Sequence, residues 1–317
     1  MRRHLIGLLI LLVAGLLYPT VMPGSLTVGI TMLLFAGWAT SWDLLGGWSG
    51  QVSLGHASFV GIGAYFVAIG AIDYELAPWW SILLAVAAAM VLALFWGRLT
   101  FRLHGAYFTL STIAIAEILR LIAINENWLT GGATGVFIST LPSPFGIDLF
   151  DRLTQFYLAL AFALGVIGTV IWISRSRFGY QLRAVREDEN SAMAAGIDPT
   201  RIKLKAFMLS SGLTAIGGGI YGMMLSFLEP HILFFLLLSV QIALTAIIGG
   251  RGTIWGPFVG AVLLVGAGEI FRTTFAEANL LIYGVLILLV ILFLPSGIVG
   301  ELNRRLVRRR YARSAQG

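Results

Sequence analysis

Hydrogen-bonding side chains gather in one glycine-rich stretch of an otherwise apolar chain, residues 46–63, GGWSGQVSLGHASFVGIG. Hydroxyl, amide and imidazole groups in this stretch belong to Ser49, Gln51, Ser53, His56 and Ser58. Polar groups at membrane depth need either a protein partner or a wet cavity. The residues alone support two interpretations equally: these side chains line a translocation pathway, or they form a hydrogen-bond network between helices.

Ionisable residues are few within the apolar segments of the sequence, which contain Asp43, Glu117 and Glu269. Glu117 and Arg120 have the i, i+3 spacing that allows two side chains on a helix to pair. Proton-coupled transport requires carboxylates or histidines near the middle of the membrane. His56 is the nearest candidate, and a structural histidine with satisfied hydrogen bonds is the favoured interpretation. The sequence therefore disfavours a proton-coupled transporter.

Motifs for catalysis and for metal binding are absent from the sequence. It contains no cysteine, which excludes disulfides, thiolate metal sites and thiol nucleophiles. It also contains no G-x-x-x-x-G-K-[ST], no H-E-x-x-H and no G-x-S-x-G pattern. We therefore expect no catalytic residue, no metal site and no enzymatic activity in this chain.

Composition places the elements that hold these residues in a membrane. The 317 residues are 58% hydrophobic and 11% charged, with a mean hydropathy of +0.90. A water-facing globule of this size cannot bury so much apolar surface, which excludes a soluble enzyme and a disordered protein. The net charge of +6 comes from basic residues between apolar runs, so it indicates topology and lipid headgroups rather than nucleic acid.

Apolar runs long enough to cross a bilayer recur along the whole sequence. We predict an all-α integral membrane protein of about ten transmembrane helices and one domain, residues 1–317. The third span carries serines and a histidine in its first turns, so a broken or re-entrant helix is the alternative there. The first run is expected to remain as an uncleaved span. The ten runs are 5–22, 26–45, 53–72, 79–97, 106–124, 156–173, 206–228, 232–250, 256–275 and 280–294.

Charged residues between these runs predict the topology. If both termini are cytoplasmic, most of the 21 lysines and arginines fall in inner segments, as the positive-inside rule requires. Residues 304–317 then form a basic cytoplasmic tail. The outer loops carry acidic residues instead: Asp73, Glu75, Glu126, Asp148, Asp151, Glu229 and Glu277.

The longest inner loop, residues 174–205, reads SRSRFGYQLRAVREDENSAMAAGIDPTRIKLK. We expect Gly179 to end the sixth span and Gly196 to end a short amphipathic helix. Asp198 and Pro199 predict the start of the next helix, as N-cap and first helical residue. Such a short helix either lies on lipid headgroups or docks into a groove of another protein, and composition alone gives these two interpretations even odds.

Glycine pairs at four-residue spacing predict close packing between membrane helices. The pairs are Gly46 and Gly50, Gly218 and Gly222, and Gly256 and Gly260.

Three stretches resemble the M-type permeases of branched-chain amino-acid ABC importers, the LIV-type permease family. They occur in the family's order, and the resemblance extends over about residues 40–300. The run Ser53-Leu54-Gly55-His56 favours the M-type subunit over its H-type partner, whereas Arg251 departs from the small or apolar residue often found there. The stretches are GWSGQVSLGHASFVGIGAY (47–65), RSRFGYQLRAVREDENSAMAAGID (175–198) and GGRGTIWGP (249–257), with Gly260 just beyond.

The resemblance implies a type II-like ABC importer permease in the bacterial cytoplasmic (inner) membrane, with several partners. These are a homologous H-type permease, two cytosolic ABC ATPase subunits that bind ATP and Mg²⁺, and a periplasmic or extracytoplasmic solute-binding protein. The chain itself is then expected to hold no cofactor. Closure of the ATPase dimer on ATP is expected to pull the helix at 181–196 inward and to switch the pathway between the permeases.

The resemblance also implies that residues 174–205 are the coupling loop that enters the ATPase groove, which favours docking over a headgroup location. Ala195 and Gly196 match the alanine–glycine pair of the family's coupling loops. Charged residues beside them are expected to set docking and register: Arg183, Arg186, Glu187, Asp188 and Glu189.

The expected function is import of branched-chain or other hydrophobic amino acids. Related permeases move urea, short amides or aromatic acids, so these solutes are alternatives for the same machinery. Alternatives of another class are a stand-alone, ion-coupled secondary transporter and a membrane anchor for a cytosolic partner.

Overall fold

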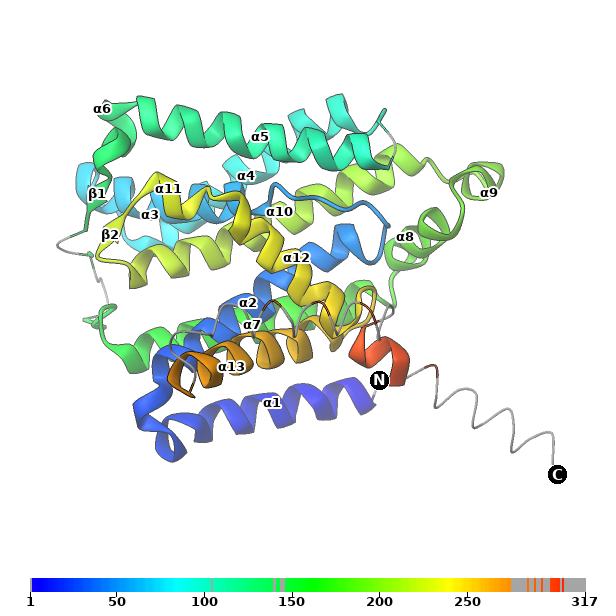
Figure 1. The fold of residues 1–317 in the computed structure, drawn as a ribbon. Coiled ribbons are helices and arrows are strands. Elements are labelled where there is room, and N and C mark those ends of the chain that lie inside the picture. Colours follow the sequence, from blue (N-terminus) through cyan, green and yellow to red (C-terminus); the bar gives the residue numbers. More distant parts are fainter. Residues whose placement is uncertain are drawn as a thin grey trace.

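Long helices run alongside one another in this computed structural model (Figure 1). It describes residues 2–103, 105–138, 141–142, 146–274 and 297–302, with the single positions 284, 288, 292 and 304. The long helices are α1 (Arg2–Val21), α2 (Leu26–Gly46), α3 (His56–Asp73), α4 (Pro78–Thr100), α5 (Ala106–Asn125), α7 (Arg152–Ile173), α10 (Pro199–Met224), α12 (Leu236–Gly250) and α13 (Gly256–Thr274).

Short elements complete the described chain. Strands β1 and β2 pair antiparallel, with Val136 opposite Leu228 and Phe137 opposite Phe227. The short elements are α6 (Asn127–Thr130), α8 (Arg177–Glu187), α9 (Glu189–Ala194), α11 (Pro230–Leu233), the 3₁₀ helices η1 (Pro23–Ser25) and η2 (Gly132–Thr134), β1 (Val136–Phe137) and β2 (Phe227–Leu228).

A helix lies at each of the first nine predicted spans, and seven helices of the described chain are long and apolar enough to cross a membrane. The predicted span 280–294 lies outside the described residues, apart from single positions. Several boundaries differ by three residues or more, among them the starts of α3, α7, α10 and α12. The third helix begins at His56 rather than at residue 53, and α12 begins at Leu236 rather than at 232 because α11 forms a separate turn. The seventh predicted span, 206–228, falls on α10, whose first turns are basic.

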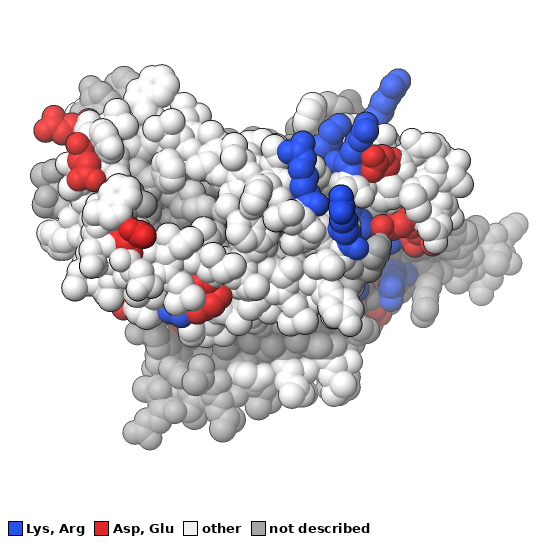
Figure 2. Space-filling view, turned by 90° about the horizontal axis from the view of Figure 1, so that it is seen from above, with Lys and Arg blue, Asp and Glu red and all other residues white. Residues whose placement is uncertain are grey.

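The two ends of the bundle differ in charge. Helices α8 and α9 lie at the same end as the start of α1, and the β1–β2 pair lies at the opposite end (Figure 1). Lysine and arginine gather at the α8–α9 end of the face seen in Figure 2, whereas acidic side chains dominate the other end. Residues 297–302 also reach the α8–α9 end, where Gly297 lies against Gly250. This arrangement is the one expected for a basic cytoplasmic face.

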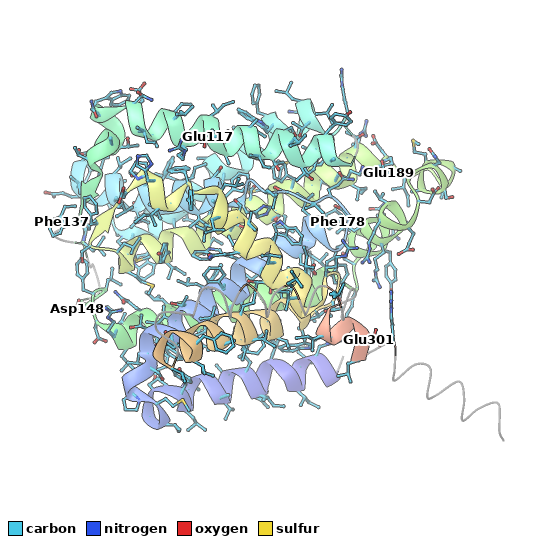
Figure 3. The ribbon with its side chains drawn as sticks, viewed as in Figure 1. Glu117, Phe137, Asp148, Phe178, Glu189 and Glu301 are labelled. Atoms are coloured by element: carbon cyan, nitrogen blue, oxygen red, sulfur yellow. The ribbon has the colours of Figure 1, made fainter. Side chains whose placement is uncertain are left out.

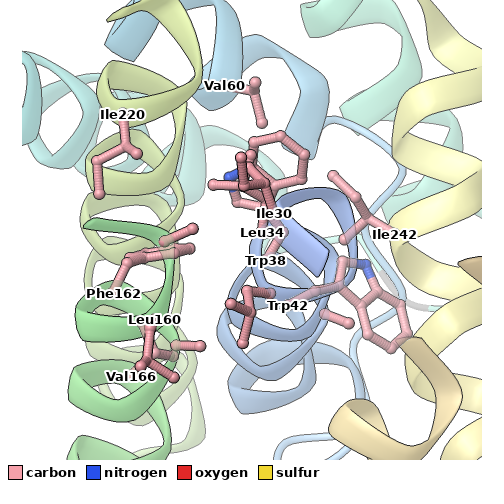
Figure 4. Close-up of a cluster of buried hydrophobic side chains, with 14 of the residues drawn as sticks. Ile30, Leu34, Trp38, Trp42, Val60, Leu160, Phe162, Val166, Ile220 and Ile242 are labelled. Atoms are coloured by element: carbon pink, nitrogen blue, oxygen red, sulfur yellow. The ribbon is translucent and has the colours of Figure 1, made fainter. Parts of the chain in front are cut away.

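Helix α2 is largely apolar and lies at the centre of the bundle, with other helices around it. Its residues from Ala36 to Gly46 are buried without interruption. Trp38 and Trp42 lie among side chains from α7, α10 and α12, including Phe162 and Ile242 (Figure 4). A helix that is hydrophobic all round is stable only where other helices surround it.

Helices α1 and α4 instead expose apolar side chains on the outside of the bundle. Leu9 and Ile10 of α1 are 58% and 62% exposed, and Val91 and Phe95 of α4 are 64% and 57% exposed. An apolar surface of this extent requires lipid rather than water around it. The chain is therefore a multi-pass integral membrane protein.

Glycines allow α3 and α10 to pack with their backbones in contact. A Cβ atom added at Gly218 would collide with the backbone of Val60, and one at Gly222 would lie 2.7 Å from the Cα of Ala64. From the other side, a Cβ at Gly63 would lie 2.6 Å from the amide nitrogen of Gly219. Small residues permit such close approach in membranes, where packing rather than hydrophobicity holds helices together.

Of the other two glycine pairs, one packs helices and one does not. Gly256 and Gly260 lie against the backbone of α12, at Gly250 and Thr245. Gly50 lies beyond the end of α2 with a φ of 78°, so it cannot form a helix-packing pair with Gly46. The pair was predicted from its four-residue spacing alone, and that spacing brings two glycines to one helix face only where both lie within a helix.

Replacing Gly218 with alanine tests the contact between α3 and α10. The added Cβ meets backbone atoms that cannot move aside, and overpacking of this kind costs about 1–3 kcal/mol. We expect Gly218→Ala to lower the thermal unfolding midpoint in detergent. Gly165→Ala on α7 is the matched control, because no atom lies within 4 Å of its added Cβ. Equal midpoints for the two variants would contradict the packing described here.

Candidate functional site

The backbone between α2 and α3, residues 47–55, is irregular and runs back into the bundle from the α8–α9 end (Figure 1). Side chains of neighbouring helices bind it: the hydroxyl of Thr112 accepts from the Leu54 amide at 2.9 Å, and the hydroxyl of Thr109 donates to the Val52 carbonyl at 2.8 Å. The Trp42 indole donates to the Ser53 carbonyl at 2.6 Å. Non-helical backbone is tolerated at membrane depth where protein groups bind it in this way.

His56 is fully buried and has a hydrogen-bond partner on each ring nitrogen. Nε2 lies 2.8 Å from the Ser210 hydroxyl and Nδ1 lies 3.2 Å from the Ser53 hydroxyl. The Ser210 hydroxyl donates to the Ser41 carbonyl at 2.6 Å, so its lone pair must accept the proton carried by Nε2. Nδ1 then accepts from Ser53, and the imidazole is neutral.

These bonds form one directed chain that joins the 47–55 segment to α2 and α10. A further bond, from the Ala57 amide to the Ser239 hydroxyl at 2.8 Å, adds α12. Ser53, His56 and Ser210 are each at most 1% exposed. This geometry favours the interhelical network over the pathway lining for Ser53 and His56.

The remaining members of the predicted pathway set lie in different surroundings. Ser58 is buried, and its hydroxyl has no partner among the described residues. The Ser49 hydroxyl donates to the Leu45 carbonyl at 2.7 Å. Ser49 and Gln51 line a cavity of about 460 Å³ together with residues of α8 and α9. The five side chains therefore do not line one common cavity.

The inner loop contains two helices rather than the single helix expected at 181–196. Helix α8 ends at Glu187, and Asp188 begins α9 by accepting from the Ser191 amide at 2.6 Å. This bond holds the pKa of the Asp188 carboxyl below its usual range. Because the folded-state pKa is lowered, the cap stabilises the folded state above the unfolded pKa, and this contribution is lost as pH falls through the folded pKa.

Gly179 does not end the sixth span, as the sequence had suggested. Helix α7 ends at Ile173, and Gly179 lies in the first turn of α8, where it packs on the Ile173 carbonyl. The caps after α9 are confirmed. Gly196 has a φ of 79°, and Asp198 accepts from the Arg201 amide at 3.1 Å.

Two arginines of the predicted docking set bind their own protein. Arg183 donates to the Ser174 carbonyl at 2.7 Å and lies over the rings of Trp48 and Tyr180. Arg186 lies against Gly50 and against Gly252, the turn between α12 and α13. Gly252 in turn donates its amide proton to both carboxylate oxygens of the buried Asp43, at 2.8 and 2.9 Å.

The acidic members of the docking set have different partners. Glu189 forms an ion pair of 2.5 Å with Lys203 of α10, whose side chain is 3% exposed. The Glu187 side chain is exposed and forms no ion pair or side-chain hydrogen bond among the described residues. Met193 of α9 is 53% exposed, and Ala195 and Gly196 are exposed beside it. Figure 3 shows Glu189 and Phe178 at the end of the bundle opposite Phe137 and Asp148.

Sequence reasoning identified the 47–55 segment and the inner loop but missed the residues that bind them. These are isolated serines and threonines within apolar helices: Ser41, Thr109, Thr112, Ser210 and Ser239. Asp43 was noted as an ionisable residue, but its bond to Gly252, which joins α2 to the turn after α12, was missed. A lone hydroxyl in an apolar helix was the available signal, because it must find a partner in the membrane.

Comparison with known proteins shows a permease family. The model of the branched-chain amino acid transport system permease component matches residues 21–293. The high-affinity branched-chain amino acid transport permease LivM of Salmonella typhimurium is 29% identical over 92% of this chain and 74% of its own length. LivM of Escherichia coli is 27% identical over 94% of this chain and 75% of its own length. LivH of Salmonella typhimurium is 25% identical over 60% of this chain and 59% of its own.

Two serine variants test the hydrogen-bond network around His56. Ser210→Ala removes the acceptor of the His56 Nε2 proton and leaves that buried donor unpaired, which costs about 1–3 kcal/mol. Ser58→Ala removes a buried hydroxyl that has no partner among the described residues, so the same substitution is expected to cost little or to stabilise. Thermal unfolding in detergent measures both. A Ser58→Ala midpoint as low as that of Ser210→Ala would contradict the assigned network.

Proposed function

Because the chain belongs to the permease family of branched-chain amino acid transport systems, we propose that it is the membrane subunit of an ATP-driven importer for branched-chain or other hydrophobic amino acids. The observation that carries this proposal is the family match over residues 21–293. The exposed α8–α9 unit at the basic end of the bundle supports it. We propose that this end faces the cytoplasm and that both termini lie there.

The proposed complex has four kinds of subunit. A homologous H-type permease completes the pathway, and the partial match to LivH supports such a pair. Two cytosolic ATPases bind ATP and Mg²⁺ and hydrolyse ATP, since this sequence has no phosphate-binding loop. An extracytoplasmic binding protein delivers the solute. The permease itself performs no covalent chemistry.

Coupling is proposed to begin at the exposed surface of α8 and α9, where Glu187 and Met193 contact the ATPase. Three internal contacts then transmit a movement of this unit to the bundle. Arg183 connects it to the end of α7, the Glu189–Lys203 pair connects it to α10, and Arg186 connects it to the turn at Gly252. Packed helices joined in this way move as rigid bodies, which is how a local push changes a distant site.

An ion-coupled transporter of one chain is the second class considered. Its pathway would require a carboxylate or imidazole free to exchange protons. His56 has both nitrogens bonded in a buried chain, and the accessible Glu117 is held in an ion pair with Arg120, which argues against that class. Uptake by the purified chain alone, driven by an ion gradient, is the result that would favour it. Urea, short amides and aromatic acids are the alternative solutes, and a ligand screen of the delivery protein separates them from amino acids.

Substitutions on the exposed surface of α8–α9 test the coupling site. We expect Glu187→Arg and Met193→Glu to reduce uptake and solute-stimulated ATP hydrolysis about tenfold in proteoliposomes that contain the whole complex. The physical reason is loss of a complementary contact of about 1.4 kcal/mol or more. The unfolding midpoint of the permease should not change, because both side chains are exposed and neither forms a side-chain hydrogen bond or ion pair within the described chain. Asp73→Arg, an exposed charge reversal at the opposite end, is the control, and normal uptake by both α8–α9 variants would refute the assignment.

A separate substitution tests the connection through Arg186. A Cβ atom at Gly252 would collide with the Arg186 guanidinium, and its φ of 73° already disfavours alanine. We expect Gly252→Ala to leave the complex assembled but to lower the amount of solute imported per ATP hydrolysed. Gly105→Ala is the matched control, since Gly105 also has a positive φ, 58°, but no neighbour within 4 Å of an added Cβ. Equal ratios of import to hydrolysis for the two variants would exclude this connection.

A further inference from the structure

A groove of about 780 Å³ lies towards the β1–β2 end, outside the sites described above. Its walls come from α2, α5, α10, α11 and α12, so it is formed by segments far apart in the sequence. A volume of this size lies within the range of small-molecule sites, about 300–1,000 Å³. The lining residues are Phe35, Glu117, Arg120, Tyr221, His231, Ile232, Phe235, Leu236, Leu237, Leu238 and Gln241.

Opposite charges stand side by side in this groove. The Arg120 guanidinium donates from Nε to the Glu117 carboxylate at 2.8 Å and from Nη2 to its second oxygen. Nη1 lies 3.2 Å from Nδ1 of His231, which is oriented to accept. A guanidinium has five N–H groups, so two of them remain without a partner among the described residues. The Glu117 side chain is 49% exposed, which leaves its carboxylate accessible.

The charge pair disfavours lipid acyl chains as the filling of the groove. Glu117 lies just beyond the midpoint of α5 as counted from the α8–α9 end, on the outer side of the bundle (Figure 3). Charged side chains at membrane depth face a protein interior or a watery cavity, because acyl chains cannot solvate them. The occupant of the groove must therefore offer polar groups to Glu117 and Arg120.

The other wall of the groove is apolar. Phe235, which immediately precedes α12, Leu238 of α12 and Tyr221 of α10 line the groove together with the charged pair. An occupant that matches both walls carries a negative group, a positive group and a hydrophobic body. A zwitterionic amino acid with an aliphatic side chain has these three parts on one carbon atom.

We propose that this groove binds the amino acid during its passage, with the substrate carboxylate on Arg120, the ammonium group on Glu117 and the aliphatic side chain against Phe235 and Leu238. His231 orients the guanidinium through its bond to Nη1. The inference rests on the proposed function and adds the residues that contact the substrate. It places them on α5, α11 and α12 rather than at the predicted set around Ser53 and His56, which is closed by its own hydrogen bonds.

Two other cavities fit a zwitterion less well. The cavity of about 430 Å³ between α3, α4 and α5 has no charged residue in its lining. The cavity of about 460 Å³ at the α8–α9 end contains Arg186 and acidic residues but has only Val185 and Met193 as apolar lining. Only the groove at Glu117 and Arg120, among these three, combines both charges with an extended apolar wall.

The test uses proteoliposomes that contain the whole complex, its binding protein and radiolabelled leucine. We expect Arg120→Gln and Glu117→Gln each to reduce ATP-driven leucine uptake about tenfold or more, since a bond to a charged group is lost. The double variant leaves no unpaired charge, so it restores stability if the pair is only structural. Under our proposal it still fails to import. Arg152→Gln, the same change outside the groove, should import as the unaltered complex does.

The cysteine-free sequence permits a second measurement that does not depend on the charges. Leu238→Cys in the otherwise unaltered complex should react with a small thiol reagent, and leucine should slow this reaction several-fold. Leu76→Cys, in the uncharged cavity, should react at a rate that leucine does not change.

Three results overturn the inference. They are normal leucine uptake by the double variant, loss of its assembly with the second permease, which would make the groove a subunit contact, and labelling of Leu238→Cys that leucine does not affect. Failure of the unaltered complex to import leucine on ATP would instead refute the proposed function, so the two failures are distinguishable.

Discussion

Backbone amides and carbonyls that leave a helix inside a membrane must find partners within the protein, because no water is available there. This constraint governs the centre of the molecule. The irregular segment 47–55 receives bonds from α2 and α5, and the His56 chain that follows it binds α2, α10 and α12. The irregular segment between α2 and α3 is thus the point at which α2, α5, α10 and α12 are joined.

Close glycine contacts act together with these bonds. The backbones of α3 and α10 touch at Gly63, Gly218 and Gly222, so the His56–Ser210 bond spans two helices that cannot slide past one another. The inner loop is joined to this unit through the ends of α7 and α10. The bonds of Ser53 and His56 thus help to hold these helices together, whereas the charged groove is lined by residues of other segments.

The sequence predicted the membrane class, nine helices within a few residues, and the caps at Gly196 and Asp198, because each depends on local composition or turn chemistry. It could not predict that His56 would bond Ser210, since the two are 154 positions apart. Nor could it predict that Arg183 and Arg186 bind their own protein, because charge on an amphipathic helix does not reveal its neighbours. Glu117 and Arg120 were predicted to pair, and they do, yet the cavity beside them arises only when α11 and α12 close its far wall.

The short β1–β2 pair has a mechanical consequence. It joins the loop after α5 to the linker between α10 and α11, and a further bond runs from the Ile138 amide to the Ser226 carbonyl at 2.9 Å. These backbone hydrogen bonds hold the ends of α5 and α10 together at the β1–β2 end. Relative movement of α5 and α10 is therefore freest at the opposite end of the bundle, which carries α8 and α9.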